Sequence, residues 1–555
     1  MRPGRLSRLF ALLGAVPLLL VTAPAHAAGL AFTTPVQLTG PGGGEPSIAT
    51  NRQGDVYVDG PQAIPSGVNG TAGVGFWVSH DKGSSFGKGV FIGSVLGGGD
   101  SDVVVPPDDA NTVYIDDLEA AATAICLSKD KGASFQSASA LPDPGNCTTL
   151  PSGQTGPSDD RPWLTADKGG RVYLTYHEFV SAQPLIFRTD NRGQDQFLAG
   201  PCGSIVTDPA IEANVPTDIS GGTLVSKPVV DQQGNLYVLF TTTTQQENAG
   251  GLPGSISGTF SQAYLAVSTD HCQSFTDHTI FDGQSVGMNS VQFGDIFNDL
   301  AIDGAGNLYT VAAGYIRSTP PPTTIADVFM FSSTDQGKTW SKPLKVNSDV
   351  GGHMLPAAVG GPAAGQLAIG YFRAVNGVTN PNDATAKWTY TAASTTNGTA
   401  GTGAGFQVAD VNPGFVYHTG DICNSGILCG SGAPGTGNDR SLLDFTSATI
   451  DGSGCVLFTF AGNPGQTIDT PNEKTWNYVT RQTSGCFPTP AVTTTTSATG
   501  ALSAAAQPAA NAPTTTLPNT APARAAAGSA VGVLAGGAMV GAVARRRRRR
   551  RPPPA

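Results

Sequence analysis

Charged side chains recur just before a series of short apolar stretches in this sequence. Carboxylates, guanidinium groups and ammonium groups together donate and accept hydrogen bonds, so they can hold a polar ligand. If the apolar stretches are neighbouring strands, these side chains form a ring of mixed sign, which suits a glycan or a peptide better than a uniformly anionic ligand. The alternative is that they are solvated charges in turns. The candidate ligand-binding residues are Glu45, Asp102, Arg161, Asp299 and Asp444, with Lys227 in the same ring.

The strands that would carry this ring are marked by a repeated turn. Four segments follow the pattern Ser-x-Asp-x-Gly-x-x-aromatic, and each comes after an apolar, β-prone stretch such as residues 328–331. The Asp carboxylate can accept hydrogen bonds from backbone N–H groups two or three residues later, and the Gly takes the positive φ that turns the chain back. The third copy has Cys272 in the Gly position. The four aspartates, which we expect to be structural, are Asp81, Asp130, Asp270 and Asp335.

A second repeat, Asp/Asn-x-x-Gly-x-apolar-Tyr, runs in step with the first and is typical of two strands joined by a tight turn. Four copies end at Tyr57, Tyr173, Tyr237 and Tyr309. The two repeats together give units of about four strands, and four-stranded units arranged around an axis are the blades of a propeller. We count seven units, or six if one of the last two is an insertion. The prediction is an all-β, seven-bladed propeller with residues 31–38 as an outer strand of the last blade.

The four Ser-x-Asp segments resemble the Asp-box, or BNR, repeats of sialidase-like β-propellers. The resemblance covers roughly residues 41–488. It implies a seven-bladed, alternatively six-bladed, sialidase-like β-propeller with the Asp-box turns on the outer rim, away from the ligand face. It does not by itself imply an activity, because one fold hosts unrelated functions.

In that family three arginines bind the substrate carboxylate, a Tyr activated by a Glu is the nucleophile, and an Asp is the acid/base. Guanidinium groups suit this role because their planar fork matches a carboxylate bidentately. The resemblance implies as candidate catalytic residues Arg161, Arg373, Arg440, Tyr176, Glu178 and Tyr417.

This chain departs from the family in the first blade. Where those enzymes carry Arg-Ile-Pro, the sequence here reads Glu45-Pro46-Ser47-Ile48. An acidic residue then stands where an arginine would meet the substrate. We therefore expect a propeller that binds a glycan or a protein at the channel mouth, with an exo-acting glycoside hydrolase of sialidase type as the alternative.

The charge balance argues against polyanionic partners, namely nucleic acid and anionic lipid. Eleven of the 31 basic residues are arginines near the two termini, and the rest of the chain carries 20 basic against 41 acidic residues. Such a surface repels nucleic acid and anionic lipid. The sequence has no phosphate-binding loop or dinucleotide fingerprint, and His177 and His418 lack the spacing of metal ligands. We expect no cofactor, no metal and a monomer.

Both ends of the sequence are typical of export to the cell envelope. Residues 1–27 combine arginines, an apolar run and an Ala-x-Ala site, as signal peptides do. After the propeller at 28–488 come a Thr/Ala/Pro-rich spacer (489–516) and the segment Leu517–Ala521. An uncharged stretch at 525–544 is long enough to span a membrane, and seven arginines follow in the basic tail (545–555).

The order of these C-terminal parts resembles a Gram-positive cell-wall sorting signal, with Ala521 where that family usually has Gly. We expect the protein to be attached to the envelope either through the wall or through a membrane anchor. The eight cysteines all lie in the exported part, which favours disulfides. The expected pairs are Cys126–Cys147, Cys202–Cys272, Cys423–Cys429 and Cys455–Cys486.

Overall fold

The computed structural model describes most of the chain between residues 29 and 489. The gaps are 41–42, 62–72, 94–97, 120–121, 138–146, 150–158, 179–182, 193–201, 213–222, 243–260, 284, 289, 294–297, 319–325, 424–438 and 468–473. The predicted signal peptide, the spacer beyond residue 489, the sorting-like segment and the membrane helix lie outside the described residues and stay predictions. No helix among the described residues is long and apolar enough to cross a membrane.

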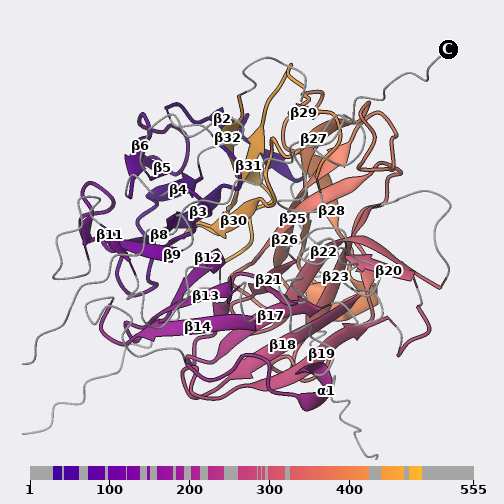
Figure 1. Cartoon of the computed structure of the whole chain (residues 1–555). Helices are drawn as coiled ribbons and strands as arrows, with labels where there is room; N and C mark the ends of the chain where they lie inside the picture. The colour runs from indigo at the N-terminus through magenta and orange to yellow at the C-terminus, as the bar shows by residue number, and fades with distance from the viewer. Residues whose placement is uncertain are drawn as a thin grey trace, which may run out of the picture. The chain divides into compact units, whose positions relative to one another are not determined.

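The described residues form seven antiparallel sheets that follow one another along the chain (Figure 1). The first contains β3 (Ser47–Thr50), β4 (Val56–Gly60), β5 (Val74–Ser79) and β6 (Val90–Ile92). The second contains β7 (Val103–Val104), β8 (Val113–Glu119), β9 (Ala122–Ser128), β10 (Gln136–Ser137) and β11 (Cys147–Thr149). The third contains β12 (Asp159–Ala166), β13 (Val172–Glu178) and β14 (Gln183–Thr189).

The remaining four sheets repeat this plan. The fourth contains β15 (Thr223–Val225), β16 (Val229–Val230), β17 (Leu236–Thr242), β18 (Gln262–Ser268) and β19 (Thr276–Asp282). The fifth contains β20 (Ser290–Phe293), β21 (Asp299–Ile302), β22 (Leu308–Arg317), β23 (Asp327–Ser333) and β24 (Leu344–Lys345). The sixth contains β25 (His353–Gly360), β26 (Leu367–Ala374), β27 (Lys387–Thr395), β28 (Gln407–Asp410) and β29 (His418–Thr419). The seventh contains β30 (Ser447–Ile450), β31 (Val456–Gly462) and β32 (Trp476–Ser484).

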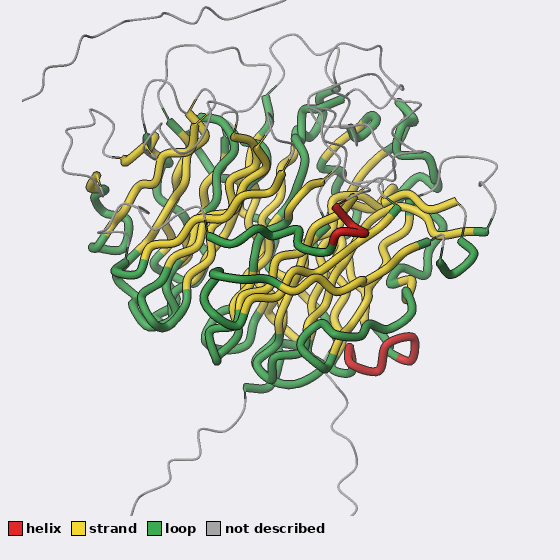
Figure 2. The backbone as a smooth tube through the Cα atoms, turned by 60° about the horizontal axis from the view of Figure 1, so that its bottom comes forward, coloured by secondary structure: helices red, strands yellow, loops and turns green. Residues whose placement is uncertain are grey.

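The sheets close into a ring. Contacts run from innermost strand to innermost strand in the order β3, β7, β12, β16, β21, β25 and β30, and β30 contacts β3 again. Apart from the short α1 (Pro209–Glu212) and η1 (Gly398–Gly403), the described residues are strands, loops and turns (Figure 2). The fold is therefore a seven-bladed β-propeller, and the seven-bladed prediction is confirmed.

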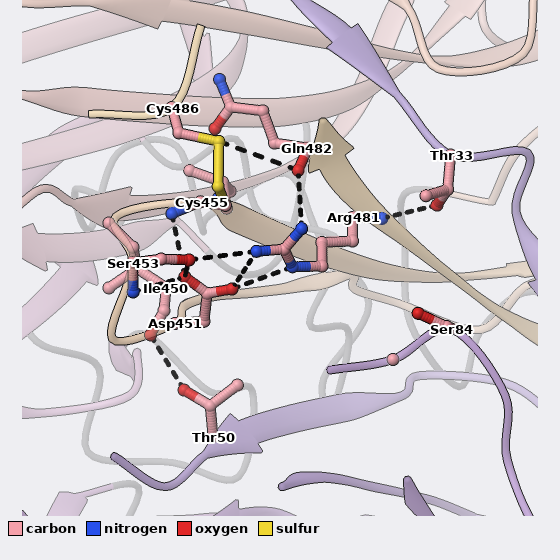
Figure 3. Close-up of polar contacts among 12 residues, drawn as sticks. Thr33, Thr50, Ser84, Ile450, Asp451, Ser453, Cys455, Arg481, Gln482 and Cys486 are labelled. Atoms are coloured by element: carbon pink, nitrogen blue, oxygen red, sulfur yellow. Dashed lines mark hydrogen bonds and ion pairs between the residues drawn. A yellow bond between two sulfur atoms is a disulfide. The ribbon is translucent and has the colours of Figure 1, made fainter. Parts of the chain in front are cut away.

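The N-terminal residues complete the last blade. The strands β1 (Ala31–Phe32) and β2 (Val36–Gln37) pair antiparallel with β32, so that Ala31 faces Ser484 and Val36 faces Val479. Figure 3 shows the seam: the Arg481 backbone N–H donates to Thr33 Oγ1 at 3.0 Å. The prediction that residues 31–38 form an outer strand of this blade is confirmed.

The four Ser-x-Asp turns share one hydrogen-bond pattern. In the first, Asp81 Oδ1 accepts the Ser85 N–H at 2.9 Å, and Asp81 Oδ2 accepts the Ser85 hydroxyl at 2.6 Å. The amide lies four residues after the aspartate, not two or three as the sequence led us to expect. The Gly83 N–H donates to Ser79 Oγ at 2.9 Å, and the glycine has φ 81°. The same bonds recur around Asp130, Asp270 and Asp335.

These turns stabilise the propeller at a distance from its axis. Asp335 joins the third and fourth strands of its blade, β23 and β24. We expect Asp335→Ala to lower the free energy of unfolding by about 1–2 kcal/mol, because it removes the acceptor for two donors of Thr339. Urea unfolding measures this. Lys338→Ala, a change at an exposed position of the same turn, should be neutral, and equal losses in the two variants would contradict the prediction.

In the part of the chain that the structure describes, two of the four predicted disulfides are seen, Cys202–Cys272 and Cys455–Cys486. Cys272 holds the glycine position of its turn with φ 68°. Cys126 and Cys423 are disulfide-bonded as well. The β9–β11 register places the Cys147 backbone opposite Cys126, and Cys429 lies outside the described residues.

Candidate functional site

Three of the innermost strands, β3, β12 and β25, have an unusual backbone turn near one end. Glu45, Arg161 and Leu355 each precede a proline and have φ of 39°, 56° and 54°. A residue before proline ordinarily takes an extended conformation, and the left-handed region is rare for residues with a side chain. The turns bring side chains of separate blades together at the axis, at one mouth of the channel.

Arg161 is the centre of the first polar cluster at this mouth. Its Nη1 lies 2.8 Å from Glu45 Oε1, its Nε lies 3.3 Å from Asp100 Oδ2, and its Nη2 is paired with Asp444 Oδ2. Only 4% of the Arg161 side chain is exposed. One guanidinium of the third blade is thus held by carboxylates at the start of the first, second and seventh blades.

This cluster holds more carboxyl groups than cations. Arg440 adds a second guanidinium, 2.9 Å from Asp444 Oδ2 and 3.8 Å from Glu45 Oε1. Burial raises the pKa of Glu45 well above its usual value despite the nearby arginines. Burial, and then the neighbouring Asp100, raise the pKa of Asp160 to about 7. The pKa of Asp100 itself is lowered, because Arg161 and other partners outweigh its burial.

Lys227 is the centre of the second cluster. Its Nζ lies 2.6 Å from Asp102 Oδ1, so it joins the fourth blade to the second. Asp102 also accepts the Ser47 hydroxyl at 2.5 Å and the Leu164 N–H at 2.8 Å. Burial, and then the charge of Asp102, raise the pKa of Asp59 and of Asp116 well above the usual value. The second cluster also has more carboxyl groups than cations.

A cavity of about 270 Å³ opens on the axis beside the two clusters. Two aromatic side chains, Trp163 and Phe445, line it with ring centroids 4.7 Å apart. The Arg161 guanidinium carbon lies 5.7 Å from the Phe445 centroid. The charged and amide side chains of its lining are Lys227, Asn298 and Asp299, and its hydroxyl side chains are Thr165, Ser226, Thr446 and Ser447.

The side-chain oxygens of Asn298 and Asp299 differ in their hydrogen bonding. The Asn298 side-chain oxygen is buried and has no hydrogen-bond partner in the described part of the chain. Asp299 Oδ2 accepts the Ala358 N–H at 2.7 Å, and its Oδ1 accepts the Leu300 N–H at 2.9 Å. Burial nevertheless raises the pKa of Asp299 to about 6.

A second cavity of about 470 Å³ lies at the opposite mouth. It shares Val230, Ile302 and Gly360 with the first cavity, so the two follow each other along the channel. The tight turns between first and second strands line it, and their aspartates are committed to those turns. For example, Asp451 Oδ1 accepts the Ser453 N–H at 2.8 Å and the Cys455 N–H at 3.0 Å, and Figure 3 shows its Oδ2 accepting the Arg481 Nε–H at 2.8 Å. The other charged and amide side chains that line this cavity are Lys168, Gln232 and Gln233, which are exposed.

The structure brings together two of the three candidate arginines. Arg161 and Arg440 meet at Glu45 and Asp444. Arg373 belongs to a separate group, with its Nη2 2.6 Å from Asp410 Oδ2 and its Nη1 3.6 Å from Asp349 Oδ2. All three guanidinium groups have carboxylate partners from the chain itself.

The candidate tyrosines lie in packed surroundings. Tyr176 is fully buried and stacks on Phe187 with centroids 5.6 Å apart. Glu178 ends the same strand, with its backbone opposite Asp159. Tyr417 packs against Phe460, and its hydroxyl accepts the Asn412 side-chain N–H at 3.3 Å.

Of the five candidate ligand-binding residues, Asp299 alone lines the axial cavity. The other four are buried and paired within the two clusters: Glu45, Asp102, Arg161 and Asp444. Asn298 and Phe445 were not predicted from the sequence. Asn298 directly precedes Asp299 and Phe445 directly follows Asp444, so adjacency to the ring charges was the available signal. In the described ranges no group of three or more His, Cys, Asp or Glu residues is arranged to hold a metal ion.

Comparisons with known proteins find solved structures of similar fold at low sequence identity. No family model matches the sequence, and no curated protein matches it significantly. A protein of unknown function from Dyadobacter fermentans is 12% identical, with 81% of this chain and 99% of that chain covered and a TM-score of 0.42. The NanB sialidase from Streptococcus pneumoniae is 11% identical, with 81% and 70% covered and a TM-score of 0.41. An ulvan lyase of polysaccharide lyase family PL25 is 11% identical, with 80% and 95% covered and a TM-score of 0.43. A function for this chain has to be inferred from its own residues.

Proposed function

We propose that this protein binds a glycan in the axial cavity and is displayed at the cell envelope. The observation that carries the proposal is the combination of Trp163 and Phe445 with Lys227, Asn298 and Asp299 around one cavity. Ligand sites are typically apolar and aromatic, with a few placed polar groups that fix orientation. A sugar matches such a site because its C–H face packs on aromatic rings while its hydroxyls bond to the polar groups.

The size of the cavity limits the part of the glycan that it holds. At about 270 Å³ it lies just below the range of about 300–1,000 Å³ that is typical for drug-sized ligands. A single sugar residue fits this space better than an oligosaccharide. Display at the envelope rests on the signal-peptide pattern of residues 1–27 and on the uncharged stretch at 525–544.

The alternative, a sialidase-type glycoside hydrolase, is disfavoured by the state of the arginines. A substrate carboxylate needs guanidinium N–H groups that are free to bind it. Arg161 is buried and already held by three carboxylates. Arg440 retains Nε and Nη1 without a partner among the described residues, but it lies beside Asp444 and Glu45, which repel an anion.

A glycan array with the purified full-length protein tests the proposal. We expect binding to non-anionic glycans, at least tenfold weaker for Asn298→Ala and unchanged for Lys338→Ala on the rim. Absence of binding to every glycan, or equal binding by the two variants, would contradict a glycan site in this cavity.

A fluorogenic sialoside assay on the same preparation distinguishes glycan binding from the alternative function, sialidase-type hydrolysis. We expect no turnover above the uncatalysed rate, because no arginine at the mouth is free of carboxylate partners. Robust turnover that is lost in Arg440→Ala would make the sialidase-type reading correct.

A further inference from the structure

The axial cavity has hydrogen-bond acceptors that the protein leaves without donors. The Asn298 side-chain oxygen lines the cavity in a residue that is only 3% exposed, and it has no partner in the described part of the chain. Two hydroxyls of the lining, those of Ser226 and Thr446, donate elsewhere. Ser226 Oγ donates to the Asn298 backbone oxygen, and Thr446 Oγ1 donates to the Leu355 backbone oxygen at 2.9 Å. The Asn298 oxygen thus keeps its acceptor capacity toward the cavity, where a ligand can supply the donor.

The same region has too few positive charges for its carboxyl groups. Lys227 is the one Lys or Arg side chain among the described residues that line the cavity. Its ammonium lies 2.6 Å from Asp102 and 3.4 Å from the Val103 backbone oxygen, so its charge is matched by Asp102. Three carboxyl groups have no ion-pair partner within 4 Å in the described chain. They are Asp299 at the cavity and Asp59 and Asp116 in the second cluster.

The titration behaviour of these carboxyl groups agrees with that imbalance. Burial and neighbouring negative charge raise the pKa of Asp59 and Asp116, and burial raises the pKa of Asp299 to about 6. Carboxyl groups with raised pKa values are those that a nearby positive charge would stabilise in the ionised form.

From the unpartnered Asn298 oxygen, the adjacent Asp299 carboxylate and the single, already paired Lys227, we infer that the ligand of this cavity carries a primary ammonium group, as an amino sugar does. The inference rests on the proposed glycan-binding function and names the class of sugar. An ammonium group supplies three N–H donors and one positive charge. A neutral hydroxyl would supply a donor but no charge.

Isothermal titration calorimetry with the purified full-length protein tests the inference. The probes are methyl glucosaminide, which has the ammonium group, and methyl glucoside, which has a hydroxyl in its place. At pH 7 we expect the glucosaminide to bind at least tenfold more tightly. At pH 5 the sugar ammonium keeps its charge while Asp299 takes up a proton, so the preference should shrink severalfold.

Two variants locate the effect. Asp299→Asn should remove most of the preference for the glucosaminide and leave the affinity for the glucoside nearly unchanged. Asn298→Leu should also weaken glucosaminide binding, which covers the case that the Asp299 variant folds poorly. The matched control is Asp383→Asn, which removes one partly exposed carboxylate whose side chain bonds to Thr385 of its own loop. It should leave the preference intact.

The outcomes separate this inference from the function on which it rests. Equal affinity for the two sugars would overturn the ammonium inference and leave the glycan proposal standing. Absence of binding by both sugars, together with an empty glycan array, would overturn both. Binding of lysine methyl ester as tightly as the glucosaminide would contradict an amino sugar and indicate a basic peptide.

Discussion

Replacement of Arg161 by methionine should lower the free energy of unfolding by about 3–5 kcal/mol, the range measured when one partner of a buried ion pair is removed. The guanidinium is buried, and its loss leaves Glu45, Asp100 and Asp444 close together without their central cation. Methionine keeps much of the side-chain volume, so the loss reports on charge more than on a cavity. Urea unfolding at pH 8, where the carboxyl groups are most ionised, measures the effect.

Arg373→Met is the matched control. Arg373 also has two carboxylate partners, but 22% of its side chain is exposed, so water screens the charges that remain. Its loss should cost about 1 kcal/mol or less. A second test combines Arg161→Met with Glu45→Gln and Asp444→Asn, which should recover part of the lost stability. Equal losses in the two single variants, or no recovery in the triple variant, would show that Arg161 does not hold the blades together by charge.

The fold could be predicted from the sequence because its signals are local. The hydrogen bonds of each Ser-x-Asp turn span four residues, as between Asp81 and Ser85, so every copy is visible in the sequence. The same holds for the turns that begin with Asp231 or Asp303, whose carboxylates accept the N–H groups two and four residues later. Counting the units that these turns mark predicts seven blades, or six if one of the last two units is an insertion, and the structure has seven.

The partners within the site could not be predicted, because they depend on closure of the ring. Arg161 and Asp444 are 283 residues apart and meet only when the third and seventh blades face each other across the axis. Arg373 lies at the same end of its blade, yet it pairs with Asp410 of the outer strand β28 and not with the axial cluster. The unpartnered oxygen of Asn298 has no sequence signal other than its position beside Asp299.

The stability of the propeller should fall as the pH rises from 5 to 8. A buried carboxyl group whose pKa is raised keeps its proton in the folded state at a pH where the unfolded chain has lost it. Folded protein then binds more protons than unfolded protein, so the free energy of unfolding decreases with pH. Asp299, with a pKa of about 6, and Asp160, with a pKa of about 7, place the change in this window. Glu45, Asp59 and Asp116 act in the same direction.

Carboxyl groups with lowered pKa values do not offset this trend. Asp81 has a pKa of about 2, to which hydrogen bonds from Ser85 contribute, so it is ionised in both states above pH 5. Each group that is protonated only in the folded state contributes about 1.4 kcal/mol per pH unit. The expected total between pH 5 and pH 8 is several kcal/mol, measured by urea unfolding at pH 5, 6.5 and 8 with the dependence on urea checked for constancy.

The variant Asp299→Asn identifies the source of the pH dependence. Asparagine cannot ionise, so the variant should lose less stability between pH 5 and pH 7 than the parent protein does, whereas Asp383→Asn should follow the parent curve. Stability that rises with pH would contradict the assignment of raised pKa values to this mouth. Protonation of Asp299 also connects stability with ligand binding. A cationic ligand that favours ionised Asp299 should stabilise the folded protein more at pH 7 than at pH 5. The reason is that Asp299 is ionised, and attracts a positive partner, at the higher pH.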